Sequence, residues 1–332
     1  MSLTKKNLVV GLVGLVLVLM VVGCSQEVTN DIDGELEVGI IQIVEHPALD
    51  ASREGFIEYL NENGYREGEE IVYDYQNAQG DMSNAQTIAN QFVNNQVDMI
   101  LAIATPTSQA VANATTEIPT LITAVTDPQE AGLVKDLEQP GTNVTGTSDL
   151  TPVQDQLELL KEISPEVKDV GILYNAGETN SVVQAEIARE VTKELGLNLV
   201  EATVSESSDV LQATESLIGR VDALYAPTDN TVASAVQAIV RVANQENLPF
   251  IVGEKGMVEG GALATTGIDY YKLGRQTGEM AIEVIEGADP AQMPIEYLEE
   301  TELIINQEAV ENINIDIPQE IINQAVEILN EE

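Results

Sequence analysis

The stretch Asp98-Met-Ile-Leu-Ala-Ile-Ala-Thr-Pro-Thr-Ser108 joins a short apolar run to a polar turn. The apolar run from Met99 to Ala104 is too short for a helix and suits a β-strand that is buried on both faces. Thr105-Pro-Thr-Ser108 follows it, and the residues after this turn have the composition of a helix. Strand ends next to helix N-termini form the ligand sites of open parallel sheets. The stretch therefore predicts an α/β fold with a binding site at the carboxyl ends of its strands.

A second stretch, Asp222-Ala-Leu-Tyr-Ala-Pro-Thr-Asp-Asn230, repeats the order of acidic residue, apolar strand, polar turn and helix. The spacing of glycines points the same way, because Gly39 and Gly64 are 25 residues apart, as are Gly171 and Gly196. Each interval holds a predicted strand, a polar loop and a helix. The sequence therefore predicts two similar Rossmann-like lobes, each with a parallel sheet, whose sites face each other.

Predicted strands and helices alternate along the chain, which favours parallel strands with right-handed crossovers. We expect residues 36–148 with about 270–300 to form lobe 1, and residues 149–269 with about 301–332 to form lobe 2. The chain would then pass between the lobes three times, which predicts a multi-strand hinge. The last segment, Pro318 to Leu329, is expected to be a helix.

The N-terminus has the pattern of a signal peptide over residues 1–23, with two lysines before an apolar run of 15 residues from Leu8 to Val22. Val21-Val-Gly-Cys24 resembles the lipobox of bacterial lipoproteins, which implies cleavage before Cys24 and a lipid anchor on its sulfur. The alternative is a plain signal peptide or anchor helix with an incidental cysteine. Residues 24–35 would be a polar tether. Cys24 is the only cysteine, so no disulfide can form within the chain.

The net charge of −42 excludes the basic surface that nucleic acids or anionic membranes require. The acidic residues are scattered along the chain rather than gathered in blocks, and the hydrophobic content of 44% is ordinary. These features predict folded lobes with a solvated acidic surface, suited to a high-salt exterior where ions screen self-repulsion.

Motifs of common enzymes are absent from the sequence. It contains no G-x-S-x-G elbow, no G-x-x-x-x-G-K-[ST] phosphate loop and no G-x-G-x-x-G turn. One histidine and one cysteine leave no Ser-His-Asp triad with a spare base and no histidine-rich zinc site. A hydrolase that uses only carboxylates stays open, but nothing marks out one acidic pair. We therefore expect a protein that is not an enzyme and has no cofactor or metal.

Polar side chains follow nearly every predicted strand, in both lobes. Hydroxyls and free backbone N–H groups at helix starts suit a carboxylate, whereas Asp127, Asp229 and Asp269 suit an ammonium group. A site with both suits an amino-acid zwitterion. The candidate ligand-binding residues are His46, Asp50, Asn77, Gln79, Thr105, Pro106, Thr107, Ser108, Asp127, Asn180, Ser181, Asp229, Asn230 and Asp269.

Each candidate also has a structural interpretation. Thr107, Asp127 and Asp229, taken singly, are ordinary helix N-caps that contribute about 1 kcal/mol without any ligand. Asn77 and Asn180 suit turns, and His46 before Pro47 suits a loop in which it bonds its own backbone.

With these polar clusters at its strand ends, the chain resembles the ABC-transporter substrate-binding lipoproteins of the tryptophan/tyrosine type, which have the type I periplasmic-binding-protein fold. The resemblance runs from about Val38 to the end of the chain. The motifs that carry it occur in the family's order: His46-Pro-Ala-Leu-Asp50, Tyr75-Gln-Asn-Ala-Gln79, Ala104-Thr-Pro106, Val125-Thr-Asp-Pro128, Pro140-Gly-Thr-Asn-Val-Thr-Gly146, Leu173-Tyr-Asn175 with Asn180-Ser181, Pro227-Thr-Asp-Asn230 and Asp269-Tyr-Tyr-Lys-Leu-Gly274.

The resemblance implies two lobes on a three-strand hinge that close on a small molecule and deliver it to a membrane permease with its ATPase. It also implies an aromatic amino acid as the ligand. A branched-chain amino acid or a sugar in the same fold, or a sensory receptor domain, stays open as an alternative. We expect Asp229→Ala to abolish binding while leaving the melting temperature of the ligand-free protein nearly unchanged.

Overall fold

The computed structural model describes residues 35–298 and 300–330. The predicted signal peptide, Cys24 and nearly all of the tether lie outside the described residues. Within the described ranges, no helix combines the length and the apolar character needed to cross a membrane.

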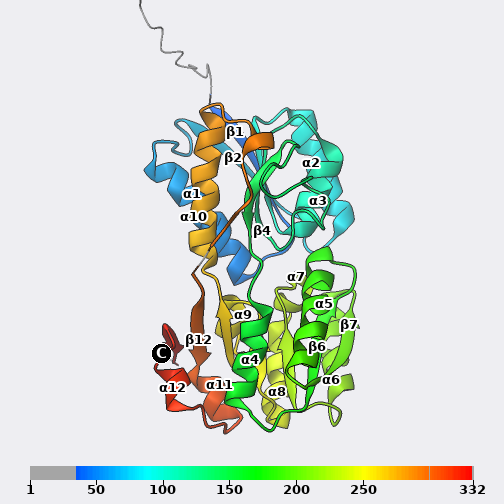
Figure 1. The fold of residues 1–332 in the computed structure, drawn as a ribbon. Coiled ribbons are helices and arrows are strands. Elements are labelled where there is room, and N and C mark those ends of the chain that lie inside the picture. Colours follow the sequence, from blue (N-terminus) through cyan, green and yellow to red (C-terminus); the bar gives the residue numbers. More distant parts are fainter. Residues whose placement is uncertain (1–34, 299, 331–332) are drawn as a thin grey trace, which may run out of the picture. The chain divides into compact units, whose positions relative to one another are not determined.

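The first sheet has the strand order β2-β1-β3-β4-β5-β11, and all its pairings are parallel (Figure 1). Its central strand β3 is the apolar run with which the sequence analysis began, and all its residues are buried. The strands are β1 (Leu36–Gln42), β2 (Ile71–Asn77), β3 (Met99–Ile103), β4 (Thr120–Val125), β5 (Val144–Ser148) and β11 (Glu296–Tyr297).

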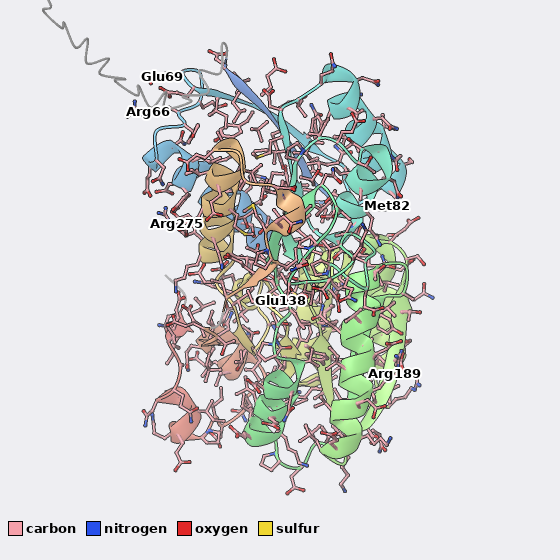
Figure 2. All side chains as sticks on the ribbon, turned by 45° about the horizontal axis from the view of Figure 1, so that its top comes forward. Arg66, Glu69, Met82, Glu138, Arg189 and Arg275 are labelled. Carbon is pink, nitrogen blue, oxygen red and sulfur yellow. The ribbon has the colours of Figure 1, made fainter. Side chains whose placement is uncertain are left out.

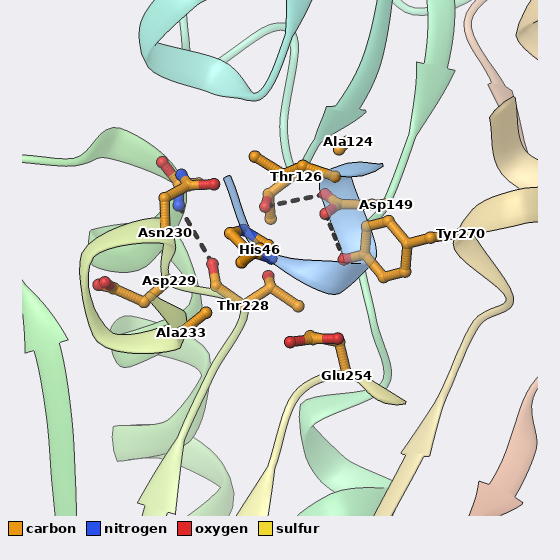
Figure 3. A pocket seen from close by; sticks show the side chains of 12 residues that line it. His46, Ala124, Thr126, Asp149, Thr228, Asp229, Asn230, Ala233, Glu254 and Tyr270 are labelled. Carbon is orange, nitrogen blue, oxygen red and sulfur yellow. Dashed lines mark hydrogen bonds between the residues drawn. The ribbon is translucent and has the colours of Figure 1, made fainter. Parts of the chain in front are cut away.

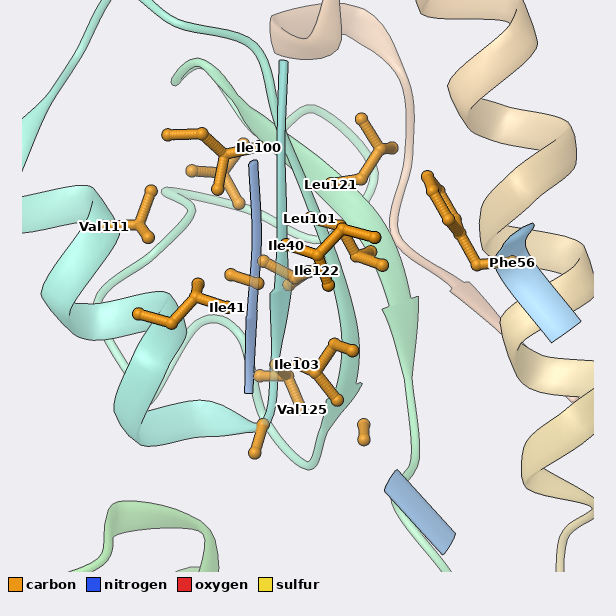
Figure 4. Close-up of a cluster of buried hydrophobic side chains, with 14 of the residues drawn as sticks. Ile40, Ile41, Phe56, Ile100, Leu101, Ile103, Val111, Leu121, Ile122 and Val125 are labelled. Carbon is orange, nitrogen blue, oxygen red and sulfur yellow. The ribbon is translucent and has the colours of Figure 1, made fainter. Parts of the chain in front are cut away.

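Helices α1 (Pro47–Glu62) and α10 (Tyr270–Ile285) cover one face of this sheet, and α2 (Met82–Asn95) and α3 (Thr105–Ala114) cover the other (Figure 1). In the core between them, Ile41 packs on the α3 side and Phe56 on the α1 side, and both are fully buried (Figure 4). Burying one such side chain stabilises the fold by about 1.5–3 kcal/mol.

Helices α1 and α10 approach so closely that glycine is required at their contact. A Cβ atom on Gly274 would lie 1.9 Å from the backbone oxygen of Ser52, and one on Gly55 would lie 2.1 Å from that of Tyr271. A side chain at either position would force the helices apart. The start of α10 is thereby held against α1.

The second sheet has the order β7-β6-β8-β9-β10-β12-β13, and only the pairing of β10 with β12 is antiparallel. Its strands are β6 (Asp169–Asn175), β7 (Asn198–Val204), β8 (Ala223–Ala226), β9 (Phe250–Val252), β10 (Ala264–Gly267), β12 (Glu302–Asn306) and β13 (Glu327–Leu329). The associated helices are α4 (Val153–Ile163), α5 (Thr179–Glu194), α6 (Val210–Leu217), α7 (Asn230–Ala233), α8 (Val236–Glu246), α9 (Lys255–Glu259), α11 (Gln307–Asn312) and α12 (Gln319–Ile322). Short 3₁₀ turns, η1 (Ser207–Asp209) and η2 (Pro290–Gln292), complete the elements.

The predicted α/β fold with two parallel-sheet lobes is confirmed. The chain passes from the first sheet to the second after β5, returns between β10 and α10, and passes again between β11 and β12. Helix α2 begins where Asp81 accepts hydrogen bonds from the N–H groups of Ser83 and Asn84.

The helix predicted for Pro318 to Leu329 is wrong. Only Gln319–Ile322 is helical, and Glu327–Leu329 forms strand β13 beside β12. The Val326 N–H already bonds the Leu303 oxygen at 2.9 Å. The edge of β12 offers backbone partners to this segment, and this tertiary pairing overrides the local helical pattern.

The arginines labelled in Figure 2 pair with acidic residues. The distances are 2.8 Å for Arg189 Nε to Glu201 Oε1 and 2.6 Å for Arg275 Nη2 to Glu62 Oε2. Partly exposed pairs of this kind contribute about 0–1 kcal/mol each. The stability of the fold therefore rests on the hydrophobic cores and not on these ion pairs.

Candidate ligand-binding site

A cavity lies where carboxyl ends of strands from both sheets meet (Figure 3). The space inside it that is open to a water molecule is only about 10 Å³, about enough for one water. A larger ligand therefore requires the lining residues to move apart. The lining residues are His46, Leu49, Ala124, Thr126, Asp149, Asn180, Thr228, Asp229, Asn230, Ala233, Glu254 and Tyr270.

The lining comes from both lobes. His46 and Leu49 belong to the start of α1, and Thr126 follows β4. Thr228 and Glu254 follow β8 and β9 of the second sheet. The cavity is therefore built from strand ends and helix starts.

Three buried carboxylates line the cavity, and no lysine or arginine does. Asp149 accepts hydrogen bonds from Thr126 Oγ1 at 3.1 Å and from Tyr270 Oη at 2.6 Å. Burial raises the pKa of Asp149 above its usual value. Because Asp149 follows β5 and Tyr270 begins α10, this bond links two of the segments that connect the lobes.

Glu254 is directed toward the Thr228 side of the cavity (Figure 3). Its carboxylate caps the short helix α9, accepting from the N–H groups of Gly256 at 2.5 Å and Met257 at 3.0 Å. Burial raises its pKa to about 7, and the two backbone bonds oppose this shift without cancelling it.

Asp229 caps α7 and is 1% exposed. It accepts from the N–H groups of Asn175 at 2.5 Å and Val232 at 2.8 Å. Its carboxylate points away from Glu254 (Figure 3). Burial and then the nearby Glu178 raise its pKa to about 7. The ammonium role of Asp229 stays a prediction, but a neutral effect of Asp229→Ala on stability is no longer expected, because two buried N–H groups would lose their acceptor.

His46 and Asn180 carry buried polar atoms without partners. Both ring nitrogens of His46 and the Oδ1 atom of Asn180 lack a hydrogen bond, although the Nδ2 atom of Asn180 donates to the Thr228 oxygen at 3.1 Å. Burial lowers the pKa of His46 to about 4, so the ring is neutral at pH 7. Since buried polar groups normally have partners, these atoms are candidates for contact with a ligand.

Helices α1, α3 and α5 begin without a side-chain cap. Next to the α3 start, the buried Oγ1 atom of Thr105 also lacks a partner. Thr107 Oγ1 and Ser108 Oγ instead bond backward to the Ala104 oxygen, at 2.9 and 2.8 Å. Among the predicted hydroxyls at this turn, Thr105 is therefore the one that the structure leaves available.

Two alanines at strand ends have the left-handed backbone that favours glycine. Ala104 before α3 has φ of 82°, and Ala124, which lines the cavity, has φ of 55°. Strained residues of this kind gather at functional sites, where the surrounding fold holds them in place.

Of the predicted residues, His46, Asn180, Asp229 and Asn230 line the cavity. A second, more open groove with about 670 Å³ of accessible space is lined by Gln79, Pro106 and again Asn230.

The other predicted residues have local partners. Asp50 pairs with Arg53 at 3.0 Å, Asp127 accepts from the Gln129 N–H in a turn, and Asp269 caps α10. Asn77 accepts from the Gln79 N–H at 2.7 Å, and Ser181 Oγ accepts from Asn180 Nδ2 at 3.2 Å.

Sequence reasoning missed Thr126, Asp149, Thr228, Glu254 and Tyr270. A usable signal existed for some of them, since Thr126 and Thr228 directly precede predicted residues and Glu254 follows the short apolar run Phe250–Val252. Tyr270 directly follows the predicted Asp269, whereas Asp149 carried no such signal, because it meets Tyr270 only through the path of the hinge segments.

Two α/β lobes with a polar, buried cavity at their facing strand ends define a ligand-binding protein. Residues 37–329 match the family described as ABC transporter substrate binding protein, and the chain belongs to this family. The predicted family is thereby confirmed. Because its members are solute-binding proteins, the prediction that the chain is not an enzyme is also confirmed.

A tyrosine-binding protein of Clostridioides difficile (strain R20291) is 44% identical over 321 residues, which cover 94% of this chain and 93% of that protein. A structure from Streptococcus pneumoniae in complex with L-Trp is 35% identical, with a TM-score of 0.86 over 89% of this chain and 100% of that one. A ligand-free, open structure of a substrate-binding protein from Clostridium difficile is 45% identical, with a TM-score of 0.68 over 89% of this chain and 99% of that one. The type I periplasmic-binding-protein fold is confirmed by these neighbours.

The similarity in structure does not follow the similarity in sequence. The chain superposes better on the L-Trp complex, with a TM-score of 0.86, than on the open structure, with 0.68, although the open protein shares more residues. The backbone of the described residues is therefore more similar to that of the L-Trp complex than to that of the open structure.

Proposed function

We propose that this protein is the extracytoplasmic, lipid-anchored receptor of an ABC importer and binds an aromatic α-amino acid between its lobes. Its partners would be the permease and its ATPase. The observation that carries the proposal is the buried cavity with unpartnered polar atoms at uncapped helix starts and carboxylates without a basic neighbour. The tyrosine-binding relative and the L-Trp complex support an aromatic side chain.

In this proposal the two ends of the amino acid are recognised by different parts of the cavity. The ligand carboxylate would lie near the starts of α1, α3 and α5, where free N–H groups and the helix dipoles favour an anion. The ammonium group would lie near the acidic residues. Residues 36–148 with about 270–300, and 149–269 with about 301–332, would then move as two bodies, and the ligand would favour the closed arrangement through contacts made only there.

A panel of the twenty amino acids, tested by thermal shift and then by calorimetry, checks the proposed ligand. We expect tyrosine, tryptophan or phenylalanine to raise the melting temperature most. At a ligand concentration of 100 times Kd, the stabilisation should be about 2.7 kcal/mol. Glucose and leucine serve as controls. A larger shift with either control would contradict the aromatic ligand.

Replacement of Cys24 tests the lipid anchor. We expect Cys24→Ala to move the protein from the membrane fraction to the soluble fraction after cell breakage, because two acyl chains provide stable anchoring that the polypeptide alone lacks. The folded lobes should be unaffected, so the variant should bind the same amino acid with the same Kd. Retention of the variant in the membrane fraction would contradict the lipoprotein proposal.

A further inference from the structure

Asp149, Asp229 and Glu254 line one cavity. These residues are 4%, 1% and 2% exposed. They come from three separate segments, so their proximity is a property of the fold and not of one acidic run. Asp149 contributes to the raised pKa of Glu254, and Glu178 contributes to the raised pKa of Asp229.

No side-chain cation lines the cavity to balance these acids. His46 at the α1 start is neutral, and Tyr270 is held in its protonated form, as burial and then Asp149 raise its pKa well above the usual value. The nearest basic group on α1, Arg53, is bonded to Asp50 and to Gln42.

The outer charged groups that act on the lining residues are acids: Asp50 acts on His46, Glu178 on Asp229 and Glu259 on Glu254. Two of these acids are themselves paired with a base, Asp50 with Arg53 at 3.0 Å and Glu259 with Lys255 at 3.7 Å. Ionising all three cavity carboxylates together would bury uncompensated negative charge, which is strongly unfavourable without a positive partner. The cavity therefore favours a bound proton near neutral pH.

The unpartnered atoms of His46 and Asn180 are an independent sign that a ligand belongs in this cavity. Both residues are more than nine-tenths buried and line it. A neutral imidazole and an amide oxygen are suited to accept or donate hydrogen bonds, whereas they cannot neutralise the acids. The missing positive charge must come from the ligand or from a proton.

We propose that the ammonium group of the ligand replaces a proton held by Asp149, Asp229 or Glu254, so that binding releases a proton near neutral pH. This inference rests on the proposed amino-acid ligand. In the step, one protonated carboxyl group loses its proton to solvent and becomes the carboxylate that faces the ammonium group. No other bond forms or breaks.

The affinity for the amino acid should therefore weaken as the pH falls. The folded ligand-free form holds the proton below about pH 7, since the pKa values of Asp229 and Glu254 are raised to about 7. Below this pH, protons compete with the ammonium group of the ligand for the carboxylate. For one displaced proton the affinity should weaken about tenfold between pH 8 and pH 6, and should change little above pH 8.

Isothermal titration calorimetry with the intact folded protein tests this directly. Tyrosine is titrated at pH 6.5 in phosphate and in a second buffer with a larger ionisation enthalpy. The difference in heat between buffers should correspond to release of a substantial fraction of one proton per ligand. Equal heats in the two buffers together with a Kd independent of pH from 6 to 8 would overturn the proposal.

Asp149→Asn and Glu254→Gln extend the test to individual groups. Each should reduce proton release or flatten the pH dependence of Kd, and Glu246→Gln at the exposed end of α8 should change neither. Asp149→Asn keeps polar partners for Thr126 and Tyr270, so it should fold. Should a variant not fold, the wild-type heats in the two buffers still decide the question.

The melting temperature of the ligand-free protein, measured against pH, distinguishes failure of this inference from failure of the proposed function. A group whose folded pKa is raised loses stability as the pH rises through that pKa. The melting temperature without ligand should therefore fall between pH 6 and pH 8, and it should fall less in Glu254→Gln. Absence of amino-acid binding with this fall preserved would reject the proposed ligand alone. Absence of the fall in the wild-type protein would reject the proton-holding cluster.

Discussion

Gly274→Ala should destabilise lobe 1 by about 3 kcal/mol, even though alanine is the better helix former by about 1 kcal/mol. The added Cβ would lie 1.9 Å from the Ser52 oxygen, and backbone atoms of α1 cannot move away without separating the helices. Chemical denaturation followed by circular dichroism measures the change.

Gly278→Ala is the matched control, because it lies one turn later in α10. There the nearest atoms to an added Cβ are Tyr59 Cβ at 3.0 Å and the Phe56 oxygen at 3.1 Å. We expect a much smaller loss. Equal stability of Gly274→Ala and the wild-type protein would show that the α1–α10 contact is looser than described.

Asp229→Ala should both abolish amino-acid binding and lower the stability of the ligand-free protein. Removing the carboxylate leaves the buried N–H groups of Asn175 and Val232 without an acceptor, at a cost of about 1–3 kcal/mol for each group. Calorimetry with tyrosine measures the binding, and urea unfolding without ligand measures the stability.

Asp229→Asn separates the two effects. The asparagine keeps one oxygen acceptor and the shape of the side chain but removes the negative charge, so stability should fall less while binding stays weak. Normal tyrosine binding by a folded Asp229→Asn protein would refute the ammonium role and leave only the helix cap. Glu254 and Asp149 would then be the remaining acids that can face the ligand.

The α/β fold could be predicted because its signals are local. The apolar run of β3, the Asp81 cap of α2 and the repeated glycine spacing are each determined by residues close in the chain. The C-terminal strand could not be predicted in this way. Glu327–Leu329 is a strand because β12 lies beside it, and only the assembled sheet supplies that neighbour.

The candidate site could be predicted only in part, because some of its residues follow apolar runs in the sequence and others meet only in the folded chain. His46, Asn180, Asp229 and Asn230 follow strands and could be found as polar residues after apolar runs. Asp149 and Tyr270 are 121 positions apart and meet by a hydrogen bond between two hinge segments. Whether a carboxylate such as Asp269 serves as a cap or faces a cavity also depends on the folded backbone, since both roles use the same residue type at a helix start.

The groove beside the cavity offers a means of watching the lobes move. Met82 from lobe 1 and Ser207 from lobe 2 both line it, and both are exposed. The only cysteine of the chain is Cys24. Thiols placed at residues 82 and 207 of a chain without Cys24 would therefore be the sole points of attachment for a pair of dyes. Energy transfer between the dyes would turn capture of a nutrient into an optical signal, without any change to the residues that line the cavity.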